Sequence, residues 1–106
     1  MIVSSTKISV IPENRKEFMQ TLHSLINRIR NEQGCVSHNV YQDVEDENAF
    51  IIIEEWETQA DLDNHLRSDR FGVLLGALSL SSATPDIRFN TLTETAGIEA
   101  LKAFRC

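Results

Sequence analysis

Three side chains that could together move a proton stand close to one another in this sequence: Glu54, Trp56 and His65. An imidazole exchanges protons near neutral pH, because its unperturbed pKa is about 6.5. A carboxylate can accept or return a proton, and the face of an indole stacks well on planar aromatic rings. If the fold brings the three side chains into one pocket, they could hold a small aromatic molecule and take a proton from it.

The local sequence predicts how these residues are positioned. The stretch 50–57 carries a β-branched run and ends in alternating carboxylate and aromatic residues, which is typical of a buried strand. Glu54 and Trp56 are two residues apart and therefore share one face of that strand. Thr58 can accept from the free backbone N–H groups of a helix start, and Asp61 follows at the spacing of a capping box. We therefore expect a strand followed at once by a helix that carries His65 at its exposed end.

Each of these residues also has a purely structural interpretation. A single histidine at a helix end is usually exposed to solvent, and a single tryptophan such as Trp56 is more often part of the core. Glu54 either forms an ion pair with an arginine such as Arg88 or faces the pocket, and we favour the ion pair. The residue types alone leave open whether the three side chains meet.

The first third of the chain predicts a strand and a long helix. Residues 1–11 form the strand, which Pro12 ends because proline donates no ladder hydrogen bond. The helix over 13–33 has one apolar stripe at helical spacing, and Gly34 supplies a left-handed residue after it. The stripe consists of Phe18, Leu22, Leu25, Ile26 and Ile29.

The middle of the chain predicts a hairpin and a second helical region. Strands over 35–42 and 50–57 flank the acidic segment 43–48, which lacks the spacing and central glycine of a calcium loop and is expected to be the hairpin tip. The helix from Thr58 should end near Arg67, where Ser68 can begin another helix. That helix has an apolar stripe made of Phe71, Leu74, Leu75 and Leu78. Its glycines, Gly72 and Gly76, suggest close approach to another backbone.

The end of the chain predicts a loop over 79–85, a last strand over 86–95 and a short terminal helix over 96–104. The order β-α-β-β-α-β indicates an α+β protein with a ferredoxin-like split βαβ sandwich, in which two helices cover one face of an antiparallel four-stranded sheet. The whole chain, 1–106, is expected to form one domain with a core over 3–93 and a C-terminal extension over 96–106.

The other face of this sheet is predicted to need a partner. The run from Ile51 to Ile53 places apolar side chains on both faces in either register. A second copy of the chain is the simplest cover, so we expect a homodimer that buries about 2,000 Å² or more.

Composition excludes several classes of function. The net charge of −6 and the scattered basic residues argue against nucleic acid as a partner. We find no run long enough to span a membrane and no leader sequence, so the expected location is the cytoplasm. The two cysteines do not make a disulfide framework: Cys35 is expected to be a small buried hydrophobe, and Cys106 is the last residue. The three histidines have no metal-ligand spacing, so we expect no metal site.

Several stretches resemble the antibiotic biosynthesis monooxygenase (ABM) domain family. The similarity covers about residues 3–93 and includes the segment 32–43, the Glu54-Glu55-Trp56 triplet after Phe50, and the helix with His65 at nine residues past the tryptophan. This resemblance implies a dimeric α+β barrel. For the founding members it implies oxygenation of small aromatic polyketides or quinols without metal, flavin or haem. Haem-degrading proteins that share this fold have an axial histidine at a position that Leu75 occupies in this chain. We therefore expect no haem, and we expect no other cofactor.

The resemblance also gives the candidate site its expected roles. His65 would be the catalytic base or a hydrogen-bond donor, and Trp56 would form a pocket wall. Other residues expected to bind the substrate are Glu54, His38 or Asn39, Phe71, Leu74 and Leu75. His38 and Asn39 fall on opposite faces of their strand, so only one of them can face inward.

The main hypothesis is therefore a cofactor-independent monooxygenase that acts on a small phenolic, quinol or polyketide-like substrate with O₂. A non-catalytic dimeric domain that binds a small ligand or serves a stress response would use the same pocket. A proton-transfer isomerase on a small carbonyl compound would use the same histidine but would need no oxygen.

Overall fold

The computed structural model describes residues 1–105 and contains four strands, one short 3-10 turn and four helices within that range. The strands are β1 (Ile2–Ser9), β2 (Cys35–Gln42), β3 (Ala49–Trp56) and β4 (Asp86–Thr91). The helices are α1 (Arg15–Arg30), α2 (Gln59–Leu66), α3 (Asp69–Leu78) and α4 (Ile98–Arg105), and the 3-10 turn η1 covers Pro12–Asn14.

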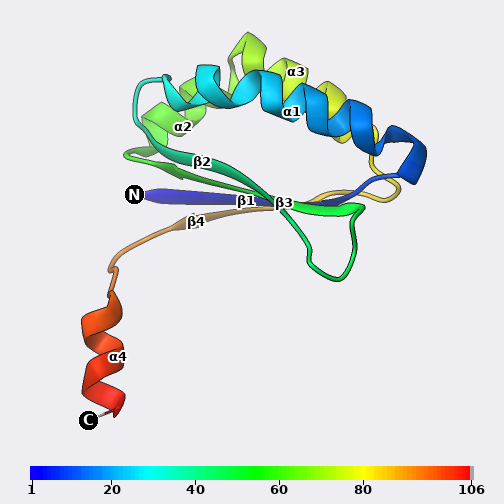
Figure 1. The fold of residues 1–106 in the computed structure, drawn as a ribbon. Coiled ribbons are helices and arrows are strands. Elements are labelled where there is room, and N and C mark those ends of the chain that lie inside the picture. Colours follow the sequence, from blue (N-terminus) through cyan, green and yellow to red (C-terminus); the bar gives the residue numbers. More distant parts are fainter. Residues whose placement is uncertain (106) are drawn as a thin grey trace.

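The strands form one antiparallel sheet in the order β2-β3-β1-β4. This is the strand order of the split βαβ sandwich, so the predicted fold class is confirmed. Helices α1, α2 and α3 all lie over one face of the sheet, whereas α4 extends away from the body of the molecule (Figure 1). The described chain has no helix that is both long and apolar enough to cross a membrane.

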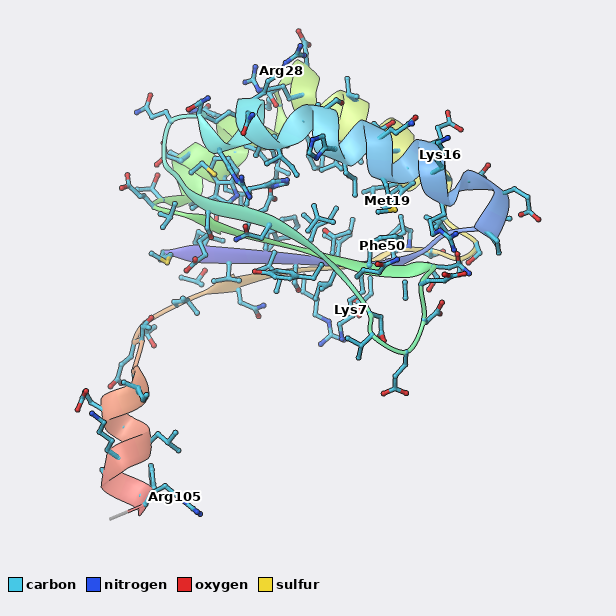
Figure 2. The ribbon with its side chains drawn as sticks, viewed as in Figure 1. Lys7, Lys16, Met19, Arg28, Phe50 and Arg105 are labelled. Atoms are coloured by element: carbon cyan, nitrogen blue, oxygen red, sulfur yellow. The ribbon has the colours of Figure 1, made fainter. Side chains whose placement is uncertain are left out.

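The core lies between the sheet and the helices, because alternate residues of each strand point into that layer. On β3 the covered positions are Phe50, Ile52, Glu54 and Trp56, all of them buried. Figure 2 shows Phe50 between the sheet and α1, and Lys7 on the opposite side of the sheet. The covered face of β3 is therefore apolar at one end and carries a carboxylate near the other.

Local sequence signals account for most element boundaries. The hydroxyl of Thr58 accepts from the backbone N–H of Asp61, and that of Ser68 accepts from Phe71, so both predicted helix starts are confirmed. Gly34 has φ +80, the left-handed conformation that its place after α1 required. A Cβ atom at this position would also collide with the side chain of Asp61, so the turn after α1 packs directly against α2.

Some predicted details are wrong. α1 begins at Arg15 because Pro12 opens a separate 3-10 turn, and β4 ends at Thr91, four residues before the predicted end. Gly72 and Gly76 approach no other backbone, since a Cβ atom at either position would meet nothing within 4 Å in the described chain. Cys35 is only partly buried, and Cys106 lies outside the described residues.

The face of the sheet away from the helices carries apolar side chains, as the run from Ile51 to Ile53 predicted. Ile51 and Ile53 are partly exposed on this face, and their cross-strand neighbours include Tyr41, which is half exposed. No element of residues 1–105 covers this face (Figure 1).

Candidate active site

The carboxylate of Glu54 is buried beneath the helices, with 4% of the residue exposed. Its neighbour on β2 is His38, and the ring Nδ1 of His38 lies 2.7 Å from Glu54 Oε2. The prediction that Glu54 pairs with an arginine such as Arg88 is wrong. Arg88 is on the opposite face of edge strand β4 and instead contacts Asp86 at 3.2 Å, because two residues apart on a strand share a face.

His65 is also buried, contrary to the expectation of an exposed helix end, because the C-terminal end of α2 packs onto β3. Its Nε2 lies 3.5 Å from Oε2 of Glu54, which is too long for a normal hydrogen bond. Its Nδ1 lies 2.9 Å from Oε2 of Glu32. The imidazole therefore stands between two carboxylates that belong to different parts of the chain.

Two aromatic rings fix the plane of the His65 imidazole. The indole of Trp56 stacks on it with a centroid distance of 4.5 Å and an interplanar angle of 27°. Phe71 meets it edge-on at 5.3 Å and 66°. Trp56 itself is fully buried. Glu54, Trp56 and His65 thus do meet, and the role of Trp56 that the geometry shows is to support the histidine.

Glu32 and Arg70 complete this cluster, and neither was among the predicted site residues. Glu32 lies in the turn after α1, and its other oxygen, Oε1, accepts from Nη2 of Arg70 at 3.3 Å. The pairs Glu32–His65 and Glu32–Arg70 are separated by 33 and 38 residues in the chain. Contacts at such separations leave no trace in local spacing, so only the fold could reveal them.

A cavity of about 240 Å³ opens beside Glu54, between the sheet and α3. Its floor is formed by three strands and its roof by α2 and α3. The lining residues are Ser4, Thr6, Ile52, Glu54, Leu66, Phe71, Leu74, Leu78, Ile87 and Phe89. Glu54 is the one ionisable side chain among them, so it is the member of the buried cluster that a bound molecule would contact.

The polar residues Ser4 and Thr6 of this cavity were also missed. Both are buried, and they occupy alternate covered positions of β1 between Ile2 and Ile8. A pair of hydroxyls in the middle of an otherwise apolar strand face is a signal that could have been found, once the direction of that face was known.

The remaining predicted residues divide between the cavity and the outer surface. His38 faces inward, whereas Asn39 pairs with Ile53 and faces the other side of the sheet. The side-chain oxygen of Asn39 accepts from Arg30, the last residue of α1, at 3.0 Å. Phe71 and Leu74 line the cavity as expected. Leu75 does not, because it lies on the outer side of α3 and is half exposed. The substrate-binding roles predicted for Asn39 and Leu75 therefore have no support in the described chain.

The charges of this region also act on the pKa of the Cys35 thiol. Burial raises the pKa of Cys35 to about 11, and the negative charges of Glu54 and Glu32 add to the effect, while Arg30 opposes it. Both carboxylates thus act on one half-buried thiol at the start of β2.

A larger and more open hollow of about 390 Å³ lies at the opposite end of the sheet, where Lys7, Asp43 and Asp86 are among its lining residues. It contains none of the buried acid and base groups described above. We therefore place the candidate active site at the smaller cavity, where an apolar chamber meets a buried cluster of titratable groups.

The profile of the antibiotic biosynthesis monooxygenase family matches residues 1–74 of the chain. The chain belongs to this family. A relative from Bacillus subtilis (strain 168), named "Putative monooxygenase YcnE", is 33% identical over 95 residues, which is 89% of this chain and 100% of the relative.

Solved structures share the fold of this chain. A conserved protein from Methanosarcina mazei Go1 has 34% identity and a TM-score of 0.79, and the match covers 84% of this chain and 89% of that one. A crystal structure of an antibiotic biosynthesis monooxygenase has a TM-score of 0.81 at 21% identity, over 89% of this chain and 100% of that chain. The predicted family and the ferredoxin-like fold are both confirmed. Family membership supports a function of the general monooxygenase kind.

Proposed function

We propose that this protein is a monooxygenase that uses O₂, without a cofactor, to oxidise a small phenolic, quinol or polyketide-like aromatic substrate in the cavity beside Glu54. The observation that carries the proposal is a buried carboxylate that faces an apolar chamber and is backed by two imidazoles, His38 and His65. Membership of the antibiotic biosynthesis monooxygenase family supports the same class of reaction.

The cavity favours a small, planar substrate. Its volume of about 240 Å³ is below the roughly 300–1,000 Å³ that is usual for sites that hold drug-sized ligands. The aromatic ring of Phe71 and the aliphatic side chains of Leu74 and Leu78 form an apolar roof over it. The hydroxyls of Ser4 and Thr6 on the floor are suitable donors to a substrate oxygen that gains negative charge.

In the reaction that we propose, Glu54 takes a proton from the substrate and so forms its carbanion or phenolate. This anion gives one electron to O₂, and the resulting radical and superoxide combine to form a C–O bond. The combination gives a peroxide anion, which takes back the first proton and becomes a hydroperoxide. The hydroperoxide then loses the second proton of the same carbon together with hydroxide, which amounts to one water, and leaves a carbonyl group. A CH₂ group and O₂ thus become C=O and H₂O, and the substrate supplies all four electrons.

Two roles differ from those predicted from the sequence. His65 was the expected base, but it does not line the cavity and stands behind Glu54. We therefore assign the first proton transfer to Glu54 and make His65 the group that receives the proton next. Trp56 holds the ring of His65 in place. We assign the pocket wall, which Trp56 was expected to form, to Phe71 and Leu74.

We further propose that the protein works as a homodimer. The uncovered face of the sheet, with Tyr41, Ile51 and Ile53, would pack against the same face of a second copy. Such an isologous contact would remove these apolar side chains from water. Sedimentation that gives a monomer at micromolar concentration would contradict this part of the proposal.

Oxygen consumption with a panel of hydroquinones and anthrones tests the reaction. We expect consumption that persists in a metal chelator and falls by about 10²–10⁴-fold in Glu54→Gln, the range typical of a lost general base. The control is Glu57→Gln, which removes an exposed carboxylate three residues away and should leave the rate unchanged.

The rival functions give different results in the same assays. A proton-transfer isomerase would exchange protons into a carbonyl substrate under nitrogen, and this exchange would depend on Glu54. A binding domain without activity would take up panel compounds with no oxygen consumption and no exchange. Either result would overturn the monooxygenase proposal.

A further inference from the structure

We propose that Glu32 is a positioning residue that sets the tautomer of His65 and carries the substrate's proton from the buried site towards water. The inference rests on the proposed function, because it concerns the proton that Glu54 removes from the substrate. The observation behind it is a continuous series of contacts from Glu54 through His65 and Glu32 to Arg70.

The contact between Glu32 and His65 determines which ring nitrogen carries the hydrogen. An ionised carboxylate can only accept, so the Nδ1 that lies 2.9 Å from Oε2 of Glu32 must be the donor. In the neutral ring this leaves Nε2 without a hydrogen. Nε2 is fully buried, has no hydrogen-bond partner within the described residues, and lies 3.5 Å from Oε2 of Glu54. It is thus ready to accept a proton that arrives on Glu54.

From His65 outwards, the exposed fraction of the side chains rises along this series. The side chains of Glu54 and His65 are 5% and 0% exposed, that of Glu32 is 9% exposed, and that of Arg70 is 39% exposed. Glu54 faces the cavity, so a bound substrate would separate it from solvent on that side. The route through His65 and Glu32 then connects the carboxylate with the molecular surface.

The proton steps balance. Glu54 takes a proton from the substrate and passes it to Nε2 of His65, and His65 gives the proton on Nδ1 to Glu32, which exchanges it with water. The same route, in reverse, returns this proton to the peroxide anion, which becomes the hydroperoxide. Glu54 then takes the second proton of the same carbon as hydroxide leaves, and a second return along the route converts the hydroxide to water. Each outward transfer leaves the imidazole in the Nε2–H tautomer, and each return transfer restores the Nδ1–H tautomer.

The surroundings of His65 leave few other groups that could serve. The titratable groups that face its ring are Glu54 from β3 and Glu32 from the turn after α1. Its two flanks are covered by the neutral rings of Trp56 and Phe71. Arg70 of α3 contacts Glu32 and not the imidazole, so it holds the carboxylate in position.

Two substitutions of Glu32 separate a proton carrier from a structural group. Glu32→Gln keeps a side-chain oxygen that can accept from Nδ1 but cannot carry the proton onward. We expect it to lower the turnover rate at least tenfold with KM unchanged, and to make the rate rise with the concentration of imidazole buffer. The wild-type rate should be independent of the buffer concentration. If Glu32→Gln turns over as fast as the wild type, or if imidazole buffer does not restore its lower rate, Glu32 is not the proton carrier.

A second measurement does not depend on activity. The ¹⁵N resonances of the His65 ring should show the Nδ1–H tautomer in the wild type and in Glu32→Gln, and a shift towards Nε2–H in Glu32→Leu, which offers no acceptor. An Nε2–H tautomer in the wild type would contradict the inference. If no panel compound consumes oxygen but the ring shows the expected tautomers, the proposed oxidation fails while the positioning of His65 by Glu32 stands.

Discussion

The layer between the sheet and the helices has two halves that differ in chemistry. In the apolar half, Phe18 of α1 packs on Phe50 of β3 with a centroid distance of 5.2 Å, and neither is appreciably exposed. In the polar half, His38, Glu54 and His65 are buried to the same degree. The same strand, β3, contributes to both halves within one run of alternating residues.

This difference shows that burial alone does not make a residue part of the stabilising core. Apolar area removed from water contributes roughly 25 cal/mol per Å², so the apolar half stabilises the fold directly. A buried carboxylate and imidazole must first lose their hydration, and their mutual attraction often no more than offsets that cost. The polar half is therefore better explained by chemistry than by stability.

The largest effect that we expect in this comparison comes from Phe18→Ala. Phe18 is fully buried and lies at the centre of the apolar half, so the truncation should lower the free energy of unfolding by about 3–5 kcal/mol. Denaturation in urea measures this loss. The activity per folded molecule should stay near that of the wild type. A loss of unfolding free energy below about 1 kcal/mol would show that the apolar half does not stabilise the fold more than the polar half does.

A smaller and more informative effect is expected when the polar half is made apolar. His38→Leu alone leaves Glu54 without its 2.7 Å partner and should cost about 3 kcal/mol. The double substitution of His38→Leu with Glu54→Leu should recover most of that loss, while activity remains abolished. The same denaturation series measures both variants. A double variant that is as unstable as the single one would mean that the pair stabilises the fold.

The smallest change concerns the thiol at the border of the polar half. Because the pKa of Cys35 is raised from 9.0 to about 11, the thiolate at pH 8 should be about a hundredfold scarcer than for an unshifted thiol. Alkylation by iodoacetamide in a Cys106→Ser background should therefore be slow at pH 8 and accelerate as the pH rises towards 11. A midpoint near pH 9 would show that burial and the charges of Glu54 and Glu32 do not act on Cys35.

The same pKa shift has a consequence for stability. The folded state favours the neutral thiol, so between pH 9 and about 11 the unfolded chain binds fewer protons at Cys35 than the folded chain does. This group's contribution to stability is therefore constant below pH 9 and is lost as the pH rises from 9 to about 11. Replacement of Cys35 by Ala should remove that part of the alkaline loss.

Much of the architecture could be predicted because it depends on short-range chemistry. The alternation of β3 and the hydroxyl caps at Thr58 and Ser68 are properties of adjacent residues, and the structure confirms them. The element order then restricted the topology to the split βαβ sandwich. The proximity of Glu54 and Trp56 followed from their spacing on one strand.

The tertiary structure alone decided the composition of the site. Whether Glu54 meets His38 or Arg88, whether Leu74 or Leu75 faces the sheet, and whether Glu32 reaches His65 all depend on how distant elements are rotated and placed against one another. A sequence specifies which side chains share a strand or a helix face through local geometry. It carries no local signal for a contact between residues 33 positions apart, because that contact exists only after the helices have packed on the sheet.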